Sequence, residues 1–211
     1  MSFQISLIHP SRSRAAKAYT TANKWINEAN VATQHIFSID EDDPQAHLYR
    51  GFDMIVKMPN TCVVEAVNHA AESATGDVLL YLSDDFTCYP NWGQDLKKVC
   101  ERYSGEYMIK VDDCLQPFLQ EVLTIPVMSK ALYKRLGYFF NPLYKSMWVD
   151  VDLYHVCMNL GVIKFHREIK YVHEHYCNGM SKRDETYNRS DAHFETGRII
   201  NHNRARQGYP I

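Results

Sequence analysis

The sequence lacks a long hydrophobic run, and its cysteines form no close cluster. No apolar stretch approaches the length of a membrane-spanning helix, and the first residues, MSFQISLIHP, carry no basic segment followed by a long apolar core. We therefore expect neither a membrane anchor nor a signal peptide. The 6 cysteines contain no CxxC pair, which argues against a zinc site and predicts reduced thiols in a cytoplasmic protein.

Charge of one sign is not in excess either. The chain has 23 Lys and Arg residues against 25 Asp and Glu residues, for a formal net charge of -2. This balance excludes the overall basic field that many nucleic-acid-binding proteins carry, so a contact with nucleic acid must be local. With 211 residues, 45% hydrophobic content and no repeats or linkers, the chain suits a single globular domain.

Predicted strands and helices alternate along the first half of the chain. Apolar runs bounded by turn residues predict strands at 4–9, 33–39, 54–57 and 78–82, the first of them ending at Pro10. Apolar residues at helical spacing predict helices at 13–29 and 63–74, the second closed by Gly76. Such alternation is typical of an α/β fold with a mostly parallel central sheet, flanking helices and right-handed crossovers.

The second half has a less regular pattern. It predicts helices at 91–103, 129–136 and 147–161, and a terminal helix at 190–207. It also predicts strands at 107–111, 122–127 and 169–172. Because no segment has the composition of a linker, we expect the second half to complete the same domain.

Two adjacent carboxylates, Asp84 and Asp85, follow the predicted strand at 78–82. In an open α/β sheet the carboxyl ends of the strands line the ligand crevice, so both side chains are expected there. Neighbouring carboxylates repel each other, and a divalent cation with oxygen ligands relieves that repulsion. The alternative is that the pair only forms a turn before Pro90. A carboxylate pair by itself leaves both interpretations open.

Several segments, taken in order, resemble the family 2 glycosyltransferases, whose Rossmann-like nucleotide-diphospho-sugar transferase fold is called GT-A. ISLIHPSRSR is similar to their first strand and nucleotide loop, and FSIDEDDP to their second strand and acidic base-binding loop. NHAAESATGDVLLYLSDDF resembles their helix, strand and DXD metal motif. LTIPVMSKALYKRLGYFFNPLYKSMWVDVDL is similar to the segment with the acceptor-side loop and the catalytic carboxylate. The likeness covers residues 5–179, and several motifs in the right order are more specific than one.

The resemblance implies one GT-A domain over residues 1–211. Its parts would be a nucleotide-sugar-binding half at 1–88, an acceptor and catalytic half at 89–180, and a C-terminal segment at 181–211. The implied reaction moves a hexosyl or pentosyl group from a nucleotide-diphosphate sugar, with a UDP-sugar as the first expectation. The implied acceptor is a hydroxyl of a glycan, a small molecule or a modified DNA base.

The chain also looks like the small free-standing transferases of bacteriophages, some of which add sugars to hydroxymethylated DNA bases. That likeness implies a DNA-modifying enzyme in the host cytoplasm. Such an enzyme would need a local basic surface to hold DNA phosphates. The arginines available for it are Arg189, Arg198, Arg204 and Arg206. The alternative is that they form the solvated face of a terminal helix.

The resemblance implies Mn²⁺ or Mg²⁺ as cofactor, because the departing pyrophosphate needs its charge neutralised. Asp85 stands at the last Asp of the family motif and is the expected first ligand, although Ser83 replaces the Asp with which that motif often begins. His173 and His175 lie two residues apart on an extended segment, and one of them is expected to complete the site. The alternative for both is a surface position at a strand end.

Asp150 is the general base that the resemblance implies, since a carboxylate must take the acceptor proton while the oxygen attacks opposite the leaving phosphate. This geometry implies an inverting transfer. In the family the base usually follows a Glu, whereas Val149 stands here, so Asp152 is a rival for the role. The alternative for Asp152 is a carboxylate that stabilises the N-terminus of its helix.

The resemblance also implies residues that bind the donor. Asp40 follows the second predicted strand and is expected to bind the base or the ribose, with Glu41 and Asp42 as rivals. Asp84 is expected to aid the ribose or the ion. The other expected donor residues are Pro10, Ser11, Arg12, Arg14 and Asn60, together with Lys182 and Arg183 for the pyrophosphate.

Trp148 and Tyr144 are expected to form an apolar platform for a sugar or acceptor ring, with Asp152 also on the acceptor side. The aromatic pair belongs to an aromatic-rich segment, so a position in the core is the alternative.

Two other functions stay open. A nucleotidyltransferase acting on a sugar phosphate is expected to carry a glycine-rich phosphate loop after the first strand, and HPSRSR contains no glycine. A non-catalytic binding protein of the same fold is compatible with Ser83 and Val149, the two departures from the family pattern. Metal-dependent hydrolysis of a donor would separate an enzyme from a binding protein.

Overall fold

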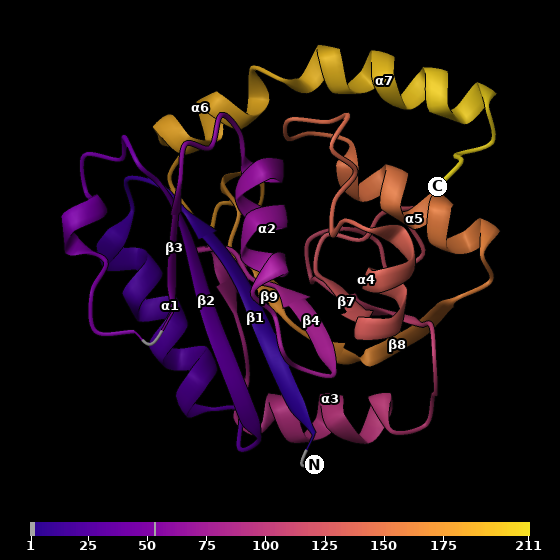
Figure 1. Cartoon of the computed structure of the whole chain (residues 1–211), viewed down its shortest axis with the longest axis horizontal. Coiled ribbons are helices and arrows are strands. Elements are labelled where there is room, and N and C mark those ends of the chain that lie inside the picture. The colour runs from indigo at the N-terminus through magenta and orange to yellow at the C-terminus, as the bar shows by residue number, and fades with distance from the viewer. Residues whose placement is uncertain (1–2, 53) are drawn as a thin grey trace.

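The computed structural model describes residues 3–52 and 54–211. It shows a central β-sheet with helices packed against both faces, and two C-terminal helices along one end of the molecule (Figure 1). Within these residues, every helix is too short or too polar to cross a bilayer.

The first half alternates strands and helices, as its sequence predicts. Its elements are β1 (Gln4–Ser11), α1 (Ala15–Asn27), β2 (Ala32–Asp40), the short 3₁₀ helix η1 (Ala46–Leu48), β3 (Ile55–Met58), α2 (Val63–Glu72) and β4 (Val78–Tyr81). β1 pairs in parallel with β2 and with β4, and β2 pairs in parallel with β3. The parallel arrangement of this half is therefore confirmed.

Pro10 lies inside β1, although the sequence predicted that the strand would end there. The carbonyl of Ile8 accepts a hydrogen bond from the N–H of Leu82, on the β4 side of β1. Because every second residue of a strand faces the same neighbouring strand, Pro10 also faces this side, where the pairing of β1 with β4 has already ended. The missing N–H of Pro10 therefore removes no hydrogen bond from the sheet, and the strand continues.

The second half contains β5 (Phe86–Thr87), α3 (Trp92–Cys100), β6 (Met108–Asp112), β7 (Pro126–Ser129), α4 (Lys130–Leu136), α5 (Val149–Asn159), β8 (Ile163–Lys170), β9 (Val172–His173), the 3₁₀ helix η2 (Tyr176–Asn178), α6 (Glu185–Asp191) and α7 (Phe194–Arg206). The helices predicted at 91–103, 129–136 and 147–161 are confirmed. The strand prediction was less accurate, because β7 begins at 126 and β8 spans 163–170, where the sequence predicted strands at 122–127 and 169–172.

The large sheet has the strand order β3-β2-β1-β4-β7-β6-β8, and β5 pairs with β9 in a separate ribbon. β7 runs antiparallel to both of its neighbours, and the other neighbouring pairs are parallel. The predicted fold class, a mostly parallel sheet flanked by helices, is therefore confirmed. Helices α2, α4 and α5 pack on the face that contains Leu79 and Met128. Helices α1 and α3 pack on the face that contains Leu80 and Val127.

The parallel pairing places the carboxyl ends of β1, β2 and β4 at one edge of the sheet. Asp84 and Asp85 follow β4 at this edge, where the crevice of an α/β sheet is expected. The β5–β9 ribbon pairs Phe86 with His173, which brings that histidine close to the two carboxylates.

Helix α7 packs against α5 through a buried ion pair and a close backbone approach. Arg204 of α7 donates a hydrogen bond to Asp152 of α5, and both side chains are buried. Gly197 lies so close to the carbonyl of Met147 that an added Cβ would stand 2.3 Å from its oxygen. The C-terminal segment is thereby fixed to the rest of the fold. The terminal helix predicted at 190–207 is confirmed as α7, and the short helix α6 before it was not predicted.

Candidate functional site

A cavity of about 500 Å³ opens at the carboxyl ends of β1, β2 and β4. Its walls come from the loops after these strands, the N-terminus of α2, parts of segments 115–124 and 145–150, and the segment from β9 to the start of α7. The residues expected from the sequence that line this cavity are Pro10, Ser11, Arg12, Arg14, Asp40, Asp84, Asp85, Asp150, His173 and His175. The structure therefore brings residues from five separate segments of the sequence together at one site.

Asp85 is 3% exposed and belongs to a small polar network. Its Oδ2 accepts a 2.7 Å hydrogen bond from the hydroxyl of Tyr187, and His173 Nε2 lies 3.4 Å from the same oxygen. Burial alone would raise the pKa of Asp85, but the polar groups of His173, Ser83 and Tyr187 together bring it well below its usual value. The side chain is therefore a buried anion.

Asp85 also offers an oxygen for a further ligand. Among the described residues, neither Asp85 Oδ1 nor His173 Nδ1 finds a hydrogen-bond partner, although both atoms are buried. A buried carboxylate oxygen of this kind fits a hard divalent cation, which Mg²⁺ sites commonly hold through one or two carboxylates and substrate phosphates. Within 3–52 and 54–211, no group of three or more His, Cys, Asp or Glu side chains forms a complete metal site. A cation at Asp85 would therefore need further oxygens from a bound ligand or from water.

His173 and His175 lie side by side, with ring centroids 4.9 Å apart. His173 faces Asp85, as the 3.4 Å distance above shows. His175 Nδ1 instead accepts a hydrogen bond from the N–H of Cys177. Burial and the neighbouring His173 lower the pKa of His175, which keeps that ring neutral. Of the two expected ligands, His173 is the better placed.

Asp84 contacts β1 and not the Asp85 network. Its Oδ1 lies 2.9 Å from His9 Nε2, and its Oδ2 accepts a 3.0 Å hydrogen bond from the hydroxyl of Ser11. His9 Nδ1 in turn lies 2.9 Å from His35 Nε2, and burial together with His9 lowers the pKa of His35 well below its usual value. A neutral His35 and a buried His9 thus hold Asp84 in place against the cavity wall.

Arg12 and Arg14, from the loop after β1, extend to different carboxylates. Arg12 Nη1 donates to Asp40 Oδ2 at 2.5 Å and also to the exposed Asp42. Arg14 donates from Nε and Nη2 to the two oxygens of Asp184, at 2.8 and 2.5 Å. Both arginines and Asp40 line the cavity, whereas Asp42 lies outside its wall.

Asp150 lies in the first turn of α5 and reaches the cavity. Its Oδ1 accepts a 2.9 Å hydrogen bond from the N–H of Val151, and no ion pair reaches it from any described residue. Burial raises the pKa of Asp150 above its usual value, and the negative charge of Asp113 adds to the effect. A half-buried carboxylate with a raised pKa and no cationic partner among the described residues has the properties of a general base.

The expected site residues that do not line the cavity are Asp42, Asn60, Tyr144, Trp148, Asp152, Lys182 and Arg183. Tyr144 and Asp152 lie in the core, where the tyrosine hydroxyl donates to Asp152 at 3.2 Å. Trp148 packs against Phe194 of α7, with ring centroids 5.4 Å apart. The geometry therefore gives no support to an acceptor platform at these positions, because they join α5 to α7.

The remaining outlying residues have other partners. Asn60 Oδ1 lies 2.6 Å from His69 Nδ1, next to the start of α2. Lys182 and Arg183 are exposed, and Arg183 pairs with Asp191 at 2.6 Å. The pyrophosphate contact expected for these two cations stays a prediction.

The sequence did not indicate two residues of the site, His9 and Tyr187. His9 carried a usable signal, because it is a titratable residue at the carboxyl end of the strand predicted at 4–9. For Tyr187 the signal was Asp184, whose side chain accepts from the N–H groups of Thr186 and Tyr187 and so caps α6.

No family model matches the chain, and neither does any curated protein sequence. Solved structures do match. TarS from S. aureus, residues 1–349, in complex with UDP-GlcNAc, is 11% identical, with a TM-score of 0.67 over 89% of this chain and 61% of that chain. The mannosyltransferase PcManGT from Pyrobaculum calidifontis, in complex with GDP-Man and Mn²⁺, is 13% identical, with a TM-score of 0.62 over 80% of this chain and 56% of that chain.

The chain spans about three fifths of the length of these two structures. At such low identity the likeness shows the fold alone. That fold is the GT-A type, as the sequence predicted.

Proposed function

We propose that this protein is a divalent-metal-dependent glycosyltransferase that moves a sugar from a nucleoside-diphosphate donor to an acceptor hydroxyl. The observation that carries the proposal is the presence of Asp85 and Asp150 in one cavity, at the carboxyl ends of β1, β2 and β4. The fold supports it, since the structures of TarS and PcManGT contain UDP-GlcNAc and GDP-Man. UDP-sugars and GDP-sugars are therefore the first donors to test.

The ends of β1 and β2 bind the nucleoside in this proposal. Pro10 and Ser11 bring backbone to the cavity wall, and Asp40 accepts from the base or the ribose. Asp40 already accepts from Arg12, so a bound nucleoside shares or replaces that contact. Asp84 is held by His9 and Ser11, and its carboxylate accepts a hydrogen bond from a ribose hydroxyl.

Asp85 and His173 are the residues that would hold the cation. A bound Mn²⁺ or Mg²⁺ supplies positive charge that stabilises the departing diphosphate. Asp85 Oδ1 supports this assignment, because it is buried and lacks a partner among the described residues. The lowered pKa of Asp85 keeps the carboxylate ionised around neutral pH, so no proton has to leave it before it can act as a ligand.

Asp150 takes the proton of the acceptor hydroxyl while that oxygen attacks the anomeric carbon. We propose inversion, with the base and the leaving diphosphate on opposite sides of the sugar ring. The rival residue, Asp152, is occupied by Arg204 and Tyr144 in the core. The role of general base therefore falls to Asp150.

The acceptor approaches along the wall formed by Gln116, Thr124 and Lys145, which line the same cavity as Asp150. Amide, hydroxyl and ammonium groups suit an acceptor that carries several hydroxyls. We therefore propose a glycan or a small polyhydroxy molecule as the acceptor class.

A DNA acceptor has less support. Of the arginines expected to hold DNA phosphates, Arg204 is buried against Asp152, and Arg198 pairs with Glu195 at 2.6 Å. Arg189 lines the cavity, so the set does not form a single basic surface.

A thermal-shift screen tests the proposed donor site. UDP, GDP, CDP, dTDP and ADP are each added with and without Mn²⁺ or Mg²⁺. A ligand that binds only the folded state adds about 2.7 kcal/mol of stability at a hundredfold excess over its Kd, so one nucleotide should raise Tm clearly, and only with metal. Failure of every nucleotide to raise Tm would contradict the proposal. Binding without metal-dependent hydrolysis of the matching nucleotide sugar would instead indicate a binding protein of this fold.

A further inference from the structure

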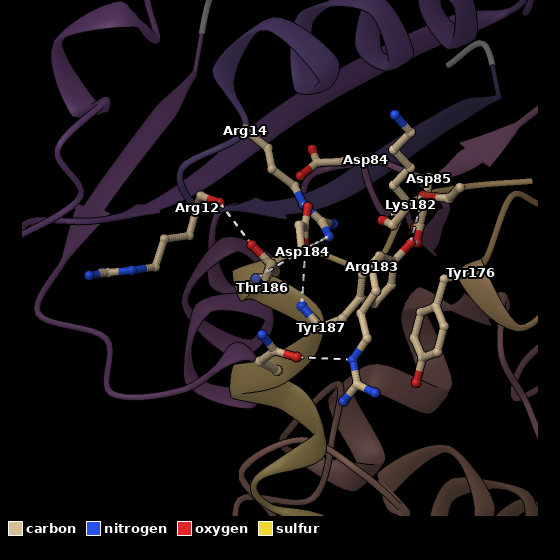
Figure 2. Close-up of polar contacts among 12 residues, drawn as sticks. Arg12, Arg14, Asp84, Asp85, Tyr176, Lys182, Arg183, Asp184, Thr186 and Tyr187 are labelled. Atoms are coloured by element: carbon tan, nitrogen blue, oxygen red, sulfur yellow. Dashed lines mark hydrogen bonds and ion pairs between the residues drawn. The ribbon is translucent and has the colours of Figure 1, made fainter.

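Residues 181–191, which include α6, supply part of the cavity wall through Thr186, Tyr187, Arg189, Ser190 and Asp191, and we refer to them as the strap. Figure 2 shows Asp184, Thr186 and Tyr187 of the strap facing Arg12, Arg14 and Asp85 of the first half of the chain. Thr186 Oγ1 donates to the carbonyl of Arg12 at 3.4 Å. The strap therefore contacts the site through residues that are about 100 to 170 positions away in the sequence.

Tyr187 is hydrogen-bonded to Asp85, the carboxylate to which we assign the cation. Its side chain is buried, and its hydroxyl donates to Asp85 Oδ2 at 2.7 Å (Figure 2). A hydroxyl proton placed against Oδ2 satisfies a lone pair that a metal ion bound through both oxygens of the carboxylate would use. While this bond is made, only Oδ1 of Asp85 is available to a cation.

The second contact of the strap joins Asp184 to Arg14. The Arg14 side chain is 8% exposed, and its guanidinium donates two hydrogen bonds to the carboxylate of Asp184. The guanidinium also stacks on the ring of Tyr187, 4.6 Å from its centroid. Two-pronged binding of a planar anion is the geometry with which arginine also binds phosphate. Asp184 therefore gives Arg14 the kind of partner that a diphosphate would give it.

The Asp184 carboxylate thus takes the place of a diphosphate at Arg14, and the Tyr187 hydroxyl takes the place of a cation at Asp85. We propose that the strap occupies the cation–diphosphate position of the proposed donor site, so that Arg14 exchanges Asp184 for the donor diphosphate and Tyr187 leaves Asp85 when the donor binds. This inference rests on the proposed function and adds the regulation of the same site. It makes Arg14 a diphosphate-binding residue and the strap an internal competitor.

If the strap competes with the donor, the apparent Kd for the donor equals the Kd of the open form divided by the fraction of molecules in which the strap is open. Removing one strap contact should therefore tighten nucleotide binding. A hydrogen bond to a charged group contributes enough to change such an equilibrium by about tenfold. A residue that directly bound the donor would show the opposite result, because its loss weakens binding.

Two variants isolate the two contacts. Tyr187→Phe removes the hydroxyl but keeps the ring on which Arg14 stacks. Asp184→Asn removes the charge but keeps a side chain that caps a helix well. Glu195→Gln is the matched control, because Glu195 forms the same two-pronged bond with Arg198 outside the strap.

The experiment is isothermal titration of UDP and of GDP, each with Mn²⁺, into the wild type and the three variants. We expect Kd to fall about tenfold in Tyr187→Phe and in Asp184→Asn and to stay unchanged in Glu195→Gln. Hydrogen exchange of residues 181–191 in the wild type should rise when the nucleotide and Mn²⁺ bind.

Unchanged or weaker binding in both strap variants would overturn the strap proposal while leaving the proposed function in place. Increased protection of residues 181–191 on binding would overturn it as well. If neither UDP nor GDP binds any of the four proteins, the titration is repeated with CDP, dTDP and ADP; failure of all five means that the proposed nucleotide site itself fails, and the strap proposal fails with it.

Discussion

Asp84 and Asp85 are neighbours in the sequence, but they contact different parts of the site. Asp84 is hydrogen-bonded to His9 and Ser11 of β1. Asp85 is hydrogen-bonded to Tyr187 and lies beside His173. Because each carboxylate has its own set of donors, the two negative charges need not share a single ligand. This separation supports one role at the ribose for Asp84 and one at the cation for Asp85.

Asp150→Asn tests the role of the general base. The amide keeps the size of the side chain and its position in α5, but it does not take up a proton. We expect kcat to fall by about 100- to 10,000-fold, the usual contribution of general base catalysis, while nucleotide Kd changes less than about twofold. Steady-state transfer assays and isothermal titration measure the two quantities. Near-normal turnover in the variant would remove Asp150 from the mechanism.

The raised pKa of Asp150 predicts a pH dependence for kcat. A general base works only when ionised, and burial shifts its pKa upward, so turnover should rise with pH through a midpoint above ~3.9, the usual aspartate value. The same shift means that ionisation of Asp150 disfavours the folded state, so its contribution to stability declines as pH rises through this range. A pH–rate profile of the wild type measures the midpoint. The rise of kcat with pH through this midpoint should be absent from the residual activity of Asp150→Asn.

At the level of elements, a buried ion pair joins the C-terminal helix α7 to α5. Arg204 of α7 and Asp152 of α5 are 8% and 1% exposed, and Arg204 has a further bond to the carbonyl of Pro210. Removing one partner of a buried pair leaves the other charge without its counterion, which typically costs about 3–5 kcal/mol.

Asp152→Asn should therefore destabilise the protein by about 3–5 kcal/mol in urea unfolding. Glu195→Gln breaks the exposed pair with Arg198 on the same helix and should leave the unfolding midpoint unchanged. Equal midpoints for the two variants would show that the buried pair does not fix α7.

Several elements were missed or misplaced because tertiary contacts, and not local sequence, determine them. β8 reads IKFHREIK, with buried residues interrupted by Lys, Arg and Glu, and it becomes a strand because it pairs in parallel with β6 at the edge of the sheet. α6 is a seven-residue polar helix whose one buried side chain, Tyr187, needs Asp85 and Arg14 beneath it. Neither pattern has the periodicity from which an element is predicted.

For the whole molecule, the sequence predicted the fold well because the first half of the sheet is built from apolar runs separated by amphipathic helices. Asp85 could be placed at the site because it follows a strand that the pattern locates, whereas Asp40 and Asp150, which also line the cavity, were expected there from the family resemblance. Tyr144 and Asp152 could not be placed from sequence, because their position depends on how α7 packs onto α5. The location of a residue that follows a strand is thus easier to predict than the location of a residue whose surroundings depend on how two helices pack.

The measurement that tests the proposed cation site most directly is isothermal titration of UDP and GDP, with and without Mn²⁺, into wild type, Asp85→Asn and Asp95→Ala. Asp95 pairs with Lys98 on α3, away from the cavity, and serves as the control. We predict that one nucleotide binds the wild type and Asp95→Ala only with Mn²⁺, and that Asp85→Asn loses this metal-dependent binding. Equal, metal-dependent affinity in Asp85→Asn and wild type would contradict the assignment of the cation to Asp85.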